Sequence, residues 1–523
     1  MQEQAAPIAK GMEADMPGIA QQRLAELLKG IAEVPAALDC WLSDIQQDSR
    51  KVTSGALFVA AEGVSSNGAQ YVEDALARGA RAVLLPGTRQ HVYEKGDVVF
   101  IELANVRPVV GIIAHRFFGQ ATHRMKVVGV TGTNGKSSVT HYVAQMAEGL
   151  GMSAAVVGTL GYGRPDSLKA TTHTTPDAVS LHRVLAELRD EGIELVAMEV
   201  SSHALDQDRA AGVNFDVAVL TNITRDHLDY HGTLEAYAEA KKRLFLSDSV
   251  RWKVFNQDDP YGARWAQELQ GPKTLTFSIG KQDQTAADVC AEDIHFDADG
   301  MSFALDLGAT REPARLALVG EFNLSNALAA CAAMSALKVE PQAVRQQLAR
   351  LTPVAGRMQR LHEDKAPTVL VDYAHTPDAL EVALKAARRH CPGRLWCVFG
   401  CGGDRDPGKR PLMGAVAAQY ADEVVLTDDN PRGEDPESIV AQIVKGAEQG
   451  AHFQVVRPRN DAIRFAVEHA AQEDVILLAG KGHEDYQEIQ GRRLPFSDIA
   501  IARDCLASVV GARGARSSAN GEI

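Results

Sequence analysis

The chain has 523 residues, 45% of them hydrophobic and 23% charged, which is enough for about three domains with ordinary globular cores. A net charge of −14, from 54 Lys and Arg against 68 Asp and Glu, disfavours extended contact with nucleic acid. The seven cysteines form no CxxC pair, so we expect reduced thiols rather than a metal site. Without a long apolar run or a signal peptide, the composition predicts a cytoplasmic protein that does not insert into membranes.

The first segment, residues 1–106, has the pattern of a small α/β unit. A helical stretch, QQRLAELLKGI, is followed by DSRKVTSGALFVA and ALARGARAVLLP, without a nucleotide-binding motif. Two terminal stretches are polar: the lead-in before this unit, and the tail GARGARSSANGEI at the other end of the chain. Both are predicted to lack stable structure.

The second segment, residues 107–352, alternates strand and helix patterns around one Gly-rich loop. An apolar run at residues 125–130 leads into GTNGKSS and then into helical spacing. Further strands are expected in ELVAMEVSS, VAVLTNI and VRWKVFN, and helices in LHRVLAELRD and LEAYAEAKKRLF. This alternation predicts a parallel sheet with helices on both faces, and the strand-rich stretch at residues 290–318 predicts antiparallel pairing.

The Gly-rich loop predicts a phosphate-binding site. Its glycines let backbone N–H groups turn toward phosphate, and the helix that follows adds its positive N-terminus. Lys136 would contact the β- and γ-phosphates, and the Ser137 hydroxyl would contact Mg²⁺. The full GxxxxGK[ST] pattern needs glycine where Val130 stands, so a simple glycine turn with a solvated lysine is the alternative. The loop residues expected at ATP are Gly132, Thr133, Asn134, Gly135, Lys136, Ser137 and Ser138.

Three more residues of this segment are chemically informative. Glu199 ends an apolar strand of the same unit, where it suits a Mg²⁺ contact or a helix cap. His227, between Asp226 and Asp229, suits a metal ligand or a structural histidine. Lys241, judged from its neighbours alone, has the pattern of a solvated helix lysine. The serines and histidine after Glu199 do not indicate a hydrolase, because sequence neighbours are not a triad and no GxSxG turn is present.

The third segment, residues 353–523, contains four apolar runs that each end in polar residues: TVLVDYAH, RLWCVFGCGG, EVVLTDDN and DVILLAGKG. Helical stretches separate them, and ligands of open α/β sheets bind beyond the carboxyl ends of such strands. Arginines suit carboxylates or phosphates, whereas carboxylates and an amide suit an ammonium group, so the cluster predicts a zwitterionic amino acid. Ordinary loop polarity is the alternative. The expected cluster comprises Asp372, His375, Arg405, Asp429, Asn430, Arg432 and Glu484.

The ordered motifs between about Asp48 and Asp498 resemble those of the Mur ligase family. They are DSR with GALFVA, GTNGKSS, TTHTTPD, MEVSSHALDQDR, TNITRDHLDYHG, AEAK, GEFNLSN, GRM, VDYAHTPDAL, GCGGDRDPGKRP, DDNPR and GKGHEDYQ. The resemblance implies three α/β domains: an N-terminal domain that binds a UDP precursor, a central P-loop-type ATPase domain with a parallel sheet, and a C-terminal Rossmann-like domain that binds an amino acid. It also implies Mg²⁺, with ATP as co-substrate.

The resemblance further implies a reaction. An ATP-dependent ligase of this kind would add meso-2,6-diaminopimelate to the D-glutamate γ-carboxylate of UDP-N-acetylmuramoyl-L-alanyl-D-glutamate, through an acyl phosphate, in peptidoglycan biosynthesis. In the family DNPR accompanies meso-diaminopimelate, whose distal carboxylate would meet Arg432. The alternatives are a lysine-adding ligase, a folylpolyglutamate-synthetase-like ligase and a nucleotide-dependent switch. The DSR motif and DNPR argue against the first two, and the dense third-segment cluster argues against the switch. A monomer is expected.

Residue roles follow from the same resemblance. The catalytic set would be Lys136, Glu199, His227 and Lys241. Mg²⁺ would be held by Ser137, Glu199, His227 and Lys241, the last as N6-carboxylysine. ATP would also contact Asn323 and Arg357, with Asp372 and His375 in the same region. The UDP precursor would contact Ser49, Val64, Ser65, Ser66, His173, Thr174, Thr175, Ser201, Gln207 and Arg209. Diaminopimelate would contact Arg405, Asp429, Asn430, Pro431, Arg432, Gly480 and Glu484.

The sequence departs from the family pattern at a few positions. Ser137 and Ser138 stand where two threonines are frequent, and both residue types carry a hydroxyl. His173 replaces an asparagine of some relatives, and Asn67 stands where aspartate often precedes glycine. The last two positions bear on individual contacts to the precursor rather than on the reaction.

Overall fold

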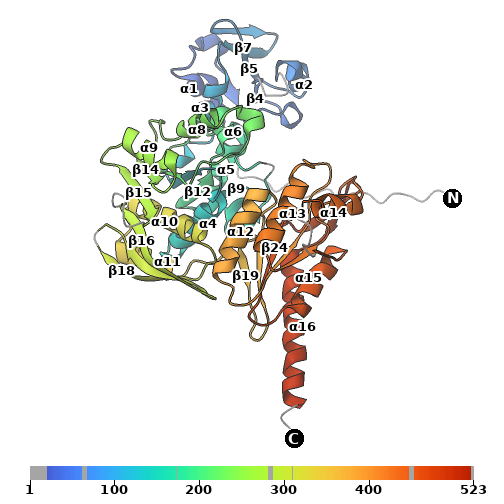
Figure 1. Cartoon of the computed structure of the whole chain (residues 1–523). Coiled ribbons are helices and arrows are strands. Elements are labelled where there is room, and N and C mark those ends of the chain that lie inside the picture. Colours follow the sequence, from blue (N-terminus) through green and yellow to red (C-terminus); the bar gives the residue numbers. More distant parts are fainter. Residues whose placement is uncertain are drawn as a thin grey trace, which may run out of the picture.

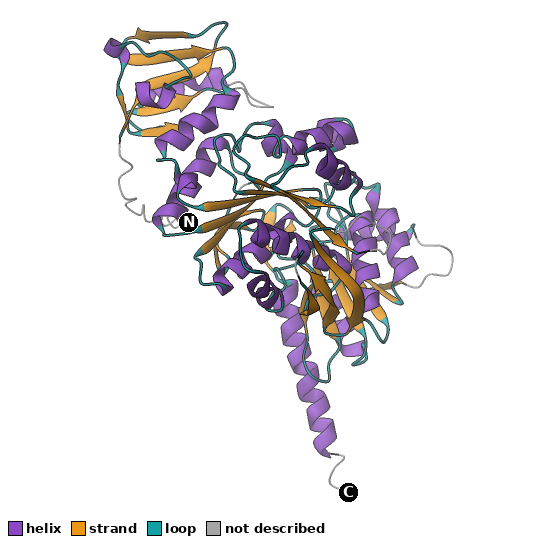
Figure 2. Ribbon diagram, turned by 90° about the vertical axis from the view of Figure 1, so that its left-hand side faces the viewer, coloured by secondary structure: helices purple, strands orange, loops and turns teal. Residues whose placement is uncertain are grey.

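The computed structural model describes residues 21–61, 68–171, 173–280, 287–308, 310–446 and 453–519, which form three α/β units. Figure 1 shows them in chain order, from the blue first unit through the green and yellow central unit to the orange and red third unit. In Figure 2, helices cover the mainly parallel sheets of the central and third units. The predicted α/β class and three-domain architecture are confirmed.

The first unit has one sheet with the strand order β3-β4-β5-β7-β6, parallel except for β6. Its strands are β3 (Asp44–Gln46), β4 (Ala56–Val59), β5 (Ala82–Pro86), β6 (His91–Lys95) and β7 (Val98–Leu103), preceded by the pair β1 (Gln22–Arg23) and β2 (Trp41–Leu42). Its helices are α1 (Leu24–Leu28), α2 (Val72–Ala77) and α3 (Arg107–Phe117), with 3₁₀ turns at Ala36–Leu38, Ser49–Lys51, Gly68–Tyr71 and Ala121–His123. Helix α3 leads into the central unit and shares one hydrophobic core with it.

The central sheet has eleven strands in the order β11-β10-β9-β12-β8-β13-β14-β15-β16-β17-β18. They are β8 (Lys126–Thr131), β9 (Ala154–Gly158), β10 (Gly161–Arg164), β11 (Ser167–Lys169), β12 (Leu195–Glu199), β13 (Val217–Leu220), β14 (Trp252–Asn256), β15 (Thr274–Ile279), β16 (Val289–Asp297), β17 (Gly300–Asp306) and β18 (Arg311–Leu316). Along the sheet, the strands β9, β12, β8, β13, β14, β15 and β16 pair in parallel, as predicted, whereas β10 and β11 add an antiparallel edge. The predicted antiparallel stretch is confirmed as β16 to β18, and it extends the same sheet because β16 also pairs with β15.

Helices cover both faces of the central sheet. They are α4 (Lys136–Gly149), α5 (Ala178–Asp190), α6 (Ser202–Asp206), α7 (Leu228–His231), α8 (Leu234–Lys242), α9 (Pro260–Glu268), α10 (Glu321–Ala336) and α11 (Pro341–Leu348). Helices α4 and α10 share the core on one face. Helix α10 is rich in alanine, and these small side chains let it pack closely against both α4 and the sheet. The core on the other face continues into the first unit.

The third unit has a six-stranded sheet with the order β19-β20-β24-β21-β22-β23. Its strands are β19 (Gln359–Leu361), β20 (Thr368–Asp372), β21 (Leu395–Phe399), β22 (Glu423–Leu426), β23 (Phe453–Val455) and β24 (Val475–Ala479), followed by the hairpin β25 (Tyr486–Ile489) and β26 (Arg492–Pro495). Its helices are α12 (Pro377–Arg389), α13 (Lys409–Tyr420), α14 (Pro436–Val444), α15 (Arg459–His469) and α16 (Asp498–Ala519). Thr376 and Asp435 cap α12 and α14, each with proline at the first helical position. The four predicted strands pair in parallel, so their polar ends share one edge.

The C-terminal tail differs from the prediction. Helix α16 continues to Ala519 and projects from the third unit in Figure 1, so most of the tail expected to be frayed is helical. The first turn is anchored by Asp498, whose carboxylate accepts two hydrogen bonds from the buried Arg459 guanidinium at 2.8 and 2.7 Å. Alanine and arginine, which recur in the tail, have high helix propensity and let the anchored helix continue. Among the described residues, no helix is both long and apolar enough to cross a membrane.

A buried histidine lies where the first unit joins the central unit. His182 of α5 is 1% exposed, its Nε2 is 2.8 Å from Ala211 O, and its ring centroid is 5.2 Å from that of His115 in α3. Burial lowers the pKa of His182 to about 4 and that of His115 to about 3. Both rings are therefore neutral at pH 7 in the folded protein.

We expect the stability of this junction to decrease in acid. Between the unfolded pKa of 6.5 and the folded value of about 4, the unfolded state binds the proton and the folded state does not. For His182 this amounts to roughly 3 kcal/mol of unfolding free energy lost on going from pH 7 to pH 4. Denaturant unfolding at both pH values measures the loss. His182→Gln should flatten the dependence, whereas the exposed-site control His91→Gln should not; equal slopes in both variants would contradict the assignment.

Candidate active site

The Gly-rich loop connects the end of β8 to the start of α4, with Lys136 as the first helical residue. Gly132 and Gly135 have φ values of 147° and 87°, which L side chains rarely adopt. A Cβ at Gly132 would collide with Thr221 Oγ1, and one at Gly135 would collide with the amide of Asn326. Val130 is fully buried within β8, so the departure from the longer glycine pattern falls in the strand and not in the loop.

Two lysines converge on this loop. Lys136 Nζ donates to the carbonyl oxygens of Gly132 at 2.9 Å and Thr133 at 2.8 Å. Lys241 Nζ donates to the same Gly132 oxygen at 2.8 Å and lies 4.5 Å from the centre of the Tyr237 ring. Lys241 is only 1% exposed, so the interpretation of it as a solvated helix lysine is wrong.

The electrostatics of the two lysines differ from those of surface lysines. Burial lowers the pKa of Lys136, and the Arg357 guanidinium lowers it further, against the opposing charges of Glu199 and Asp226. Burial and the nearby Lys136 charge hold the pKa of Lys241 well below its usual range. A lowered pKa favours the neutral, nucleophilic form of a lysine amine, whereas at Lys136 the charges of Glu199 and Asp226 favour the ammonium.

Glu199 lies beside the helical end of the loop. Its carboxylate accepts hydrogen bonds from Ser137 Oγ at 2.9 Å, from the Thr159 N–H at 2.9 Å and from Thr159 Oγ1 at 3.2 Å, and it is 1% exposed. A side chain at Gly158 would collide with this carboxylate. The arrangement brings a hydroxyl and a carboxylate oxygen together where the sequence predicts Mg²⁺ contacts, and hard divalent cations prefer oxygen ligands.

His227 is more exposed to solvent than Glu199. It has a left-handed backbone with φ of 51°, its side chain is 48% exposed, and its Nε2 is 3.5 Å from Asp226 Oδ2. The rings of His203 and Tyr237 lie 4.8 and 6.2 Å from it. In the part of the chain that the structure describes, no three His, Cys, Asp or Glu side chains form a ready-made metal site. The role of His227 at Mg²⁺ stays a prediction.

Four of the residues predicted at the UDP precursor form one hydrogen-bonded group next to Glu199, and a fifth lies beside it on Thr159. Thr175 Oγ1 donates to the Glu199 backbone oxygen at 2.9 Å and accepts from the Ser201 N–H at 3.2 Å. Arg209 donates to Thr175 O at 3.0 Å and to Gln207 Oε1 at 2.6 and 3.0 Å. The fifth residue, Thr174, has its hydroxyl 3.0 Å from that of Thr159.

The other residues predicted at the precursor lie elsewhere. Ser49 is buried in the first unit, and its hydrogen bond helps to lower the pKa of Asp74. His173 is exposed beside Thr174. Val64, Ser65 and Ser66 fall outside the described residues. Their roles stay predictions.

Asn323, one of the two residues predicted at ATP outside the loop, lies in α10. Asn323 is buried, with its amide bound to Tyr142 Oη at 3.0 Å and to Val319 O at 2.9 Å, so the side chain packs α10 onto α4. Asn326, one turn further along α10, lies directly against Gly135. The sequence analysis missed Asn326, although the second asparagine of GEFNLSN was a signal for it.

Arg357 lies between the loop and the third unit. Its guanidinium is 5.0 Å from the centre of the Tyr373 ring, and its charge lowers the pKa of Lys136. Asp372, at the end of β20, accepts from the N–H groups of Met358 at 2.7 Å and Ala374 at 2.9 Å, while burial raises its pKa. His375 Nδ1 is 2.8 Å from Tyr373 O. The Arg357 charge thus acts on the loop, whereas the contacts of Asp372 and His375 lie within the third unit.

The expected amino-acid cluster converges at the carboxyl edge of the third sheet. Asn430 Nδ2 donates to Glu484 Oε2 at 2.9 Å, although the two residues are 54 positions apart. A Cβ at Gly480 would lie 2.7 Å from Asp429 Oδ2, so glycine is required at this approach. Pro431, between Asn430 and Arg432, is buried.

The two arginines of this cluster flank Gly402. A Cβ built on Gly402 would lie 2.9 Å from Arg432 Nη1 and 3.7 Å from Arg405 Cγ. Arg432 Nη1 donates to Gly403 O at 2.8 Å, and its Nε is 3.3 Å from Glu488 Oε2. Arg405 is exposed. Cationic groups and carboxylates therefore lie side by side, as recognition of a zwitterion requires.

The sequence analysis missed Lys481. It lies between the two glycines of GKG and is 0% exposed, and its Nζ is 3.0 Å from Glu484 Oε2. Its position directly after a predicted strand was the available signal. Gly356 also packs so closely on His483 that a Cβ there would collide with the backbone of this segment.

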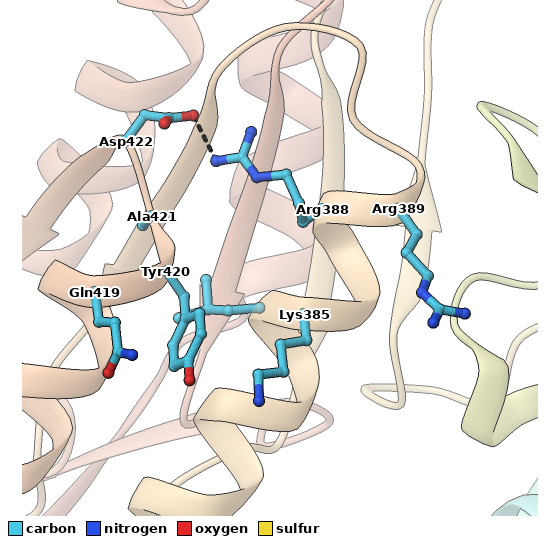
Figure 3. Close-up of a pocket in the computed structure, with 8 residues that line it drawn as sticks. Lys385, Arg388, Arg389, Gln419, Tyr420, Ala421 and Asp422 are labelled. Atoms are coloured by element: carbon cyan, nitrogen blue, oxygen red, sulfur yellow. Dashed lines mark hydrogen bonds and ion pairs between the residues drawn. The ribbon is translucent and has the colours of Figure 1, made fainter.

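A separate surface cavity of about 580 Å³ lies between the C-terminal ends of α12 and α13 (Figure 3). Three cations line it, and each is already paired: Lys385 with Glu381, Arg388 with Asp422 and Arg389 with Glu321. No predicted site residue lines the cavity, so the chemistry described above lies elsewhere.

A Gly-rich loop at a helix N-terminus, together with a cluster of arginines and carboxylates at the edge of a second sheet, fits the class of nucleotide-dependent ligases. Three family models match: "Mur ligase family, catalytic domain" at residues 42–118, "Mur ligase middle domain" at 130–334 and "Mur ligase, glutamate ligase domain" at 356–482. The chain belongs to the Mur ligase family, and the predicted resemblance is confirmed.

Curated relatives and solved structures agree with this membership. A protein of Alkalilimnicola ehrlichii named "UDP-N-acetylmuramoyl-L-alanyl-D-glutamate--2,6-diaminopimelate ligase" is 47% identical over 94% of this chain and 100% of its own length. A Pseudomonas aeruginosa protein of the same name is 46% identical over 90% of this chain and 96% of its own. A solved structure titled with that enzyme name has a TM-score of 0.72 and 37% identity, covering 94% of this chain and 99% of that one. A solved structure of a Mycobacterium tuberculosis folylpolyglutamate synthase has a TM-score of 0.55 over 70% of this chain and 91% of its own. At 19% identity it shows a shared fold alone.

Proposed function

We propose that this protein is an ATP-dependent ligase that adds meso-2,6-diaminopimelate to the D-glutamate γ-carboxylate of UDP-N-acetylmuramoyl-L-alanyl-D-glutamate. The observation that carries the proposal is the convergence of Asn430, Arg432 and Glu484 at one edge of the third sheet. Relatives that are 46–47% identical and named for this reaction support it. The proposal keeps the cytoplasmic location and the monomeric state expected from the sequence.

Each domain has one part of the reaction in this proposal. Residues 1–106 bind the uridine end of the precursor, residues 107–352 bind ATP, and residues 353–523 bind the amino acid. The group around Thr175, Ser201 and Arg209 holds the muramoyl-dipeptide next to Glu199. Thr175 bonds to the Glu199 backbone oxygen, and the Ser201 N–H and the Arg209 guanidinium both bond to Thr175. The γ-carboxylate then lies close to the phosphates on the loop.

The first chemical step activates the carboxylate. A γ-carboxylate oxygen forms a bond to the γ-phosphorus of ATP, the bond to the bridging oxygen breaks, and ADP leaves with that electron pair. Lys136 exchanges its two loop carbonyl partners for phosphate oxygens and stabilises the charge that develops there. Ser137 and Glu199, with oxygens 2.9 Å apart, fit Mg²⁺, and His227 and a carboxylated Lys241 complete the proposed set. Bound Mg²⁺ would neutralise phosphate charge and polarise the transferred group.

The second step forms the amide. The neutral amine of diaminopimelate attacks the acyl carbon, the tetrahedral intermediate expels phosphate with the C–O electron pair, and the nitrogen loses a proton. Asn430, Arg432 and Glu484 hold the distal end of the amino acid, which carries both an ammonium and a carboxylate. Lysine lacks that second carboxylate, so Arg432 would be left without its partner, a loss that typically weakens binding by about 2–5 kcal/mol.

Phosphate release from ATP tests the proposal directly. The unmutated protein is mixed with ATP, Mg²⁺ and the UDP-muramoyl dipeptide, and either meso-diaminopimelate or L-lysine is added. Release with diaminopimelate alone, with a product heavier by one residue, is the expected result. Release with lysine would support the lysine-adding alternative instead, and hydrolysis that ignores the precursor would support the nucleotide switch.

Replacing Arg432 should change amino-acid recognition selectively. We expect Arg432→Ala and Arg432→Lys to raise the KM for meso-diaminopimelate roughly thirty-fold, because truncating a desolvated charge partner costs about 2 kcal/mol or more. The KM for ATP should stay unchanged. Arg388→Ala removes an arginine of the same domain at the separate cavity and is the matched control. A change confined to the KM for ATP would show that the pocket is assigned wrongly.

A further inference from the structure

Lys481 lies within the cluster predicted to bind the amino acid, and its side chain is not exposed to solvent. Its segment leaves β24 through Gly480 and Gly482, whose φ values of 114° and 54° turn the chain sharply on both sides of the lysine. The side chain is 0% exposed, and the rings of Tyr486 and Phe496 have their centres 5.6 and 5.8 Å from Nζ. A buried ammonium needs close acceptors, because removing it from water without partners is costly.

The acceptors of Lys481 are two residues of the pocket. Nζ lies 3.0 Å from Glu484 Oε2 and 3.1 Å from Asn430 Oδ1. Asn430 Oδ1 also accepts from the Glu488 N–H at 2.9 Å, while Asn430 Nδ2 donates to Glu484 Oε2 at 2.9 Å. Two donors on one side and a carboxylate on the other determine which way the Asn430 amide points. Lys481 thereby keeps the Asn430 N–H₂ group directed at Glu484.

Glu484 is held at one oxygen only. Within the described part of the chain, both hydrogen bonds to its side chain fall on Oε2, from Lys481 and from Asn430. Oε1 is thus the oxygen available to a ligand, and the side chain retains 17% exposure. A carboxylate whose second oxygen is clamped in this way presents a fixed acceptor to an incoming ammonium group, which reduces the ordering cost of binding.

Lys481 also sets the charge balance of the pocket. The charges that act on one another there are four cations and four carboxylates: Lys481, Arg405, Arg432, Arg459, Asp429, Glu484, Glu488 and Asp498. A ligand with two ammonium groups and two carboxylates is itself neutral and matches this balance. A diamine with one carboxylate, such as lysine, carries a net positive charge and would be favoured if the pocket lost a cation.

We propose that Lys481 is a positioning residue that determines amino-acid specificity by clamping Asn430 and Glu484 and by balancing the pocket charge. The inference rests on the proposed function, because it concerns the site that binds diaminopimelate. Lys481 touches its two pocket partners rather than the reacting atoms. Its removal should therefore change recognition of the amino acid and leave phosphoryl transfer intact.

The test compares the full-length unmutated protein with Lys481→Met, Lys481→Gln and the control Lys385→Met, whose lysine lies at the separate cavity. The KM and kcat for meso-diaminopimelate and L-lysine are measured at saturating ATP and precursor, together with the KM for ATP and the melting temperature. For Lys481→Met we expect the KM for diaminopimelate to rise about ten-fold or more, as loss of a charged hydrogen bond predicts. The kcat and the KM for ATP should stay within about two-fold. The preference for diaminopimelate over lysine should fall, Lys481→Gln should be intermediate, and Lys385→Met should match the unmutated protein.

The outcomes separate this inference from the proposed function. If the unmutated protein uses neither amino acid, the proposed function fails, and the inference falls with it. If it uses diaminopimelate but Lys481→Met leaves KM and preference unchanged, only the inference is overturned. A fall in kcat with the same KM would also overturn it. If Lys481→Met no longer melts cooperatively, the same kinetic comparison is made with Lys481→Gln. If neither variant folds, Lys481 is needed for stability and the positioning role is overturned.

Discussion

Lys136→Ala is expected to abolish turnover, with kcat lowered about a thousand-fold, the upper range for losing one electrostatic contact to a developing charge. Lys136 is the first residue of α4, and its ammonium lies within reach of both loop carbonyls that surround the phosphate position. No other donor of the loop carries a full positive charge. Single-turnover phosphate transfer from ATP measures the effect on the first chemical step.

The control for Lys136 is Lys126→Ala. Lys126 begins the strand that leads to the loop, has a side chain 54% exposed and pairs with Asp216, so its removal should leave kcat unchanged. Lys136→Arg should stay strongly impaired, because a planar guanidinium does not fit a position built around a compact ammonium. Near-normal rates in Lys136→Ala would refute the role of the loop in phosphate binding.

Lys241→Ala should lower kcat about a hundred-fold and should respond to added small carboxylic acids. Burial holds the pKa of Lys241 well below its usual range and so favours the neutral amine that attacks CO₂. In that step a C–N bond forms, the electrons of one C=O π bond move to oxygen, the nitrogen loses a proton, and the new carboxylate carries the negative charge. Acetate or propionate placed in the cavity left by the truncated side chain would supply a carboxylate in its stead. Steady-state rates with and without these acids measure the rescue.

Lys242→Ala is the matched control for Lys241. The two residues are neighbours in α8, but Lys242 Nζ lies 2.5 Å from Glu268 Oε2 and 5.8 Å from the centre of the Trp265 ring, away from the loop. Lys242→Ala should keep its activity and show no response to the acids. Absence of rescue in Lys241→Ala, or equal rescue in both variants, would leave carboxylation of Lys241 unsupported.

Local sequence patterns predicted most of the fold. The four apolar runs of the third segment became β20, β21, β22 and β24, since buried parallel strands are continuously apolar and end in polar residues. Parallel pairing then brings these ends to one edge, so the convergence of Asn430 with Glu484 could be expected from topology alone. The tail was predicted wrongly because its composition was judged without the anchor at Asp498.

Burial of individual polar side chains could not be predicted in this way. Lys241 has the spacing of an exposed helix residue. It is buried all the same, because its Nζ donates a hydrogen bond to the loop carbonyl of Gly132, which lies 109 positions earlier in the chain. Asn323 and Asn326 are one turn apart on α10, and only the packing of that helix against α4 decides which amide meets the loop. Lys481 has no local feature that shows it is enclosed by Tyr486 and Phe496.

The sequence by itself determined the order of strands and helices, the phosphate loop, the pocket motifs and the family, because these depend on spacing and residue type over short stretches. The lowered pKa of Lys241, the direction of the Asn430 amide and the enclosure of Lys481 follow from the tertiary structure alone. These properties depend on desolvation and on partners supplied by distant segments, and neither is encoded in the neighbours of a residue along the chain.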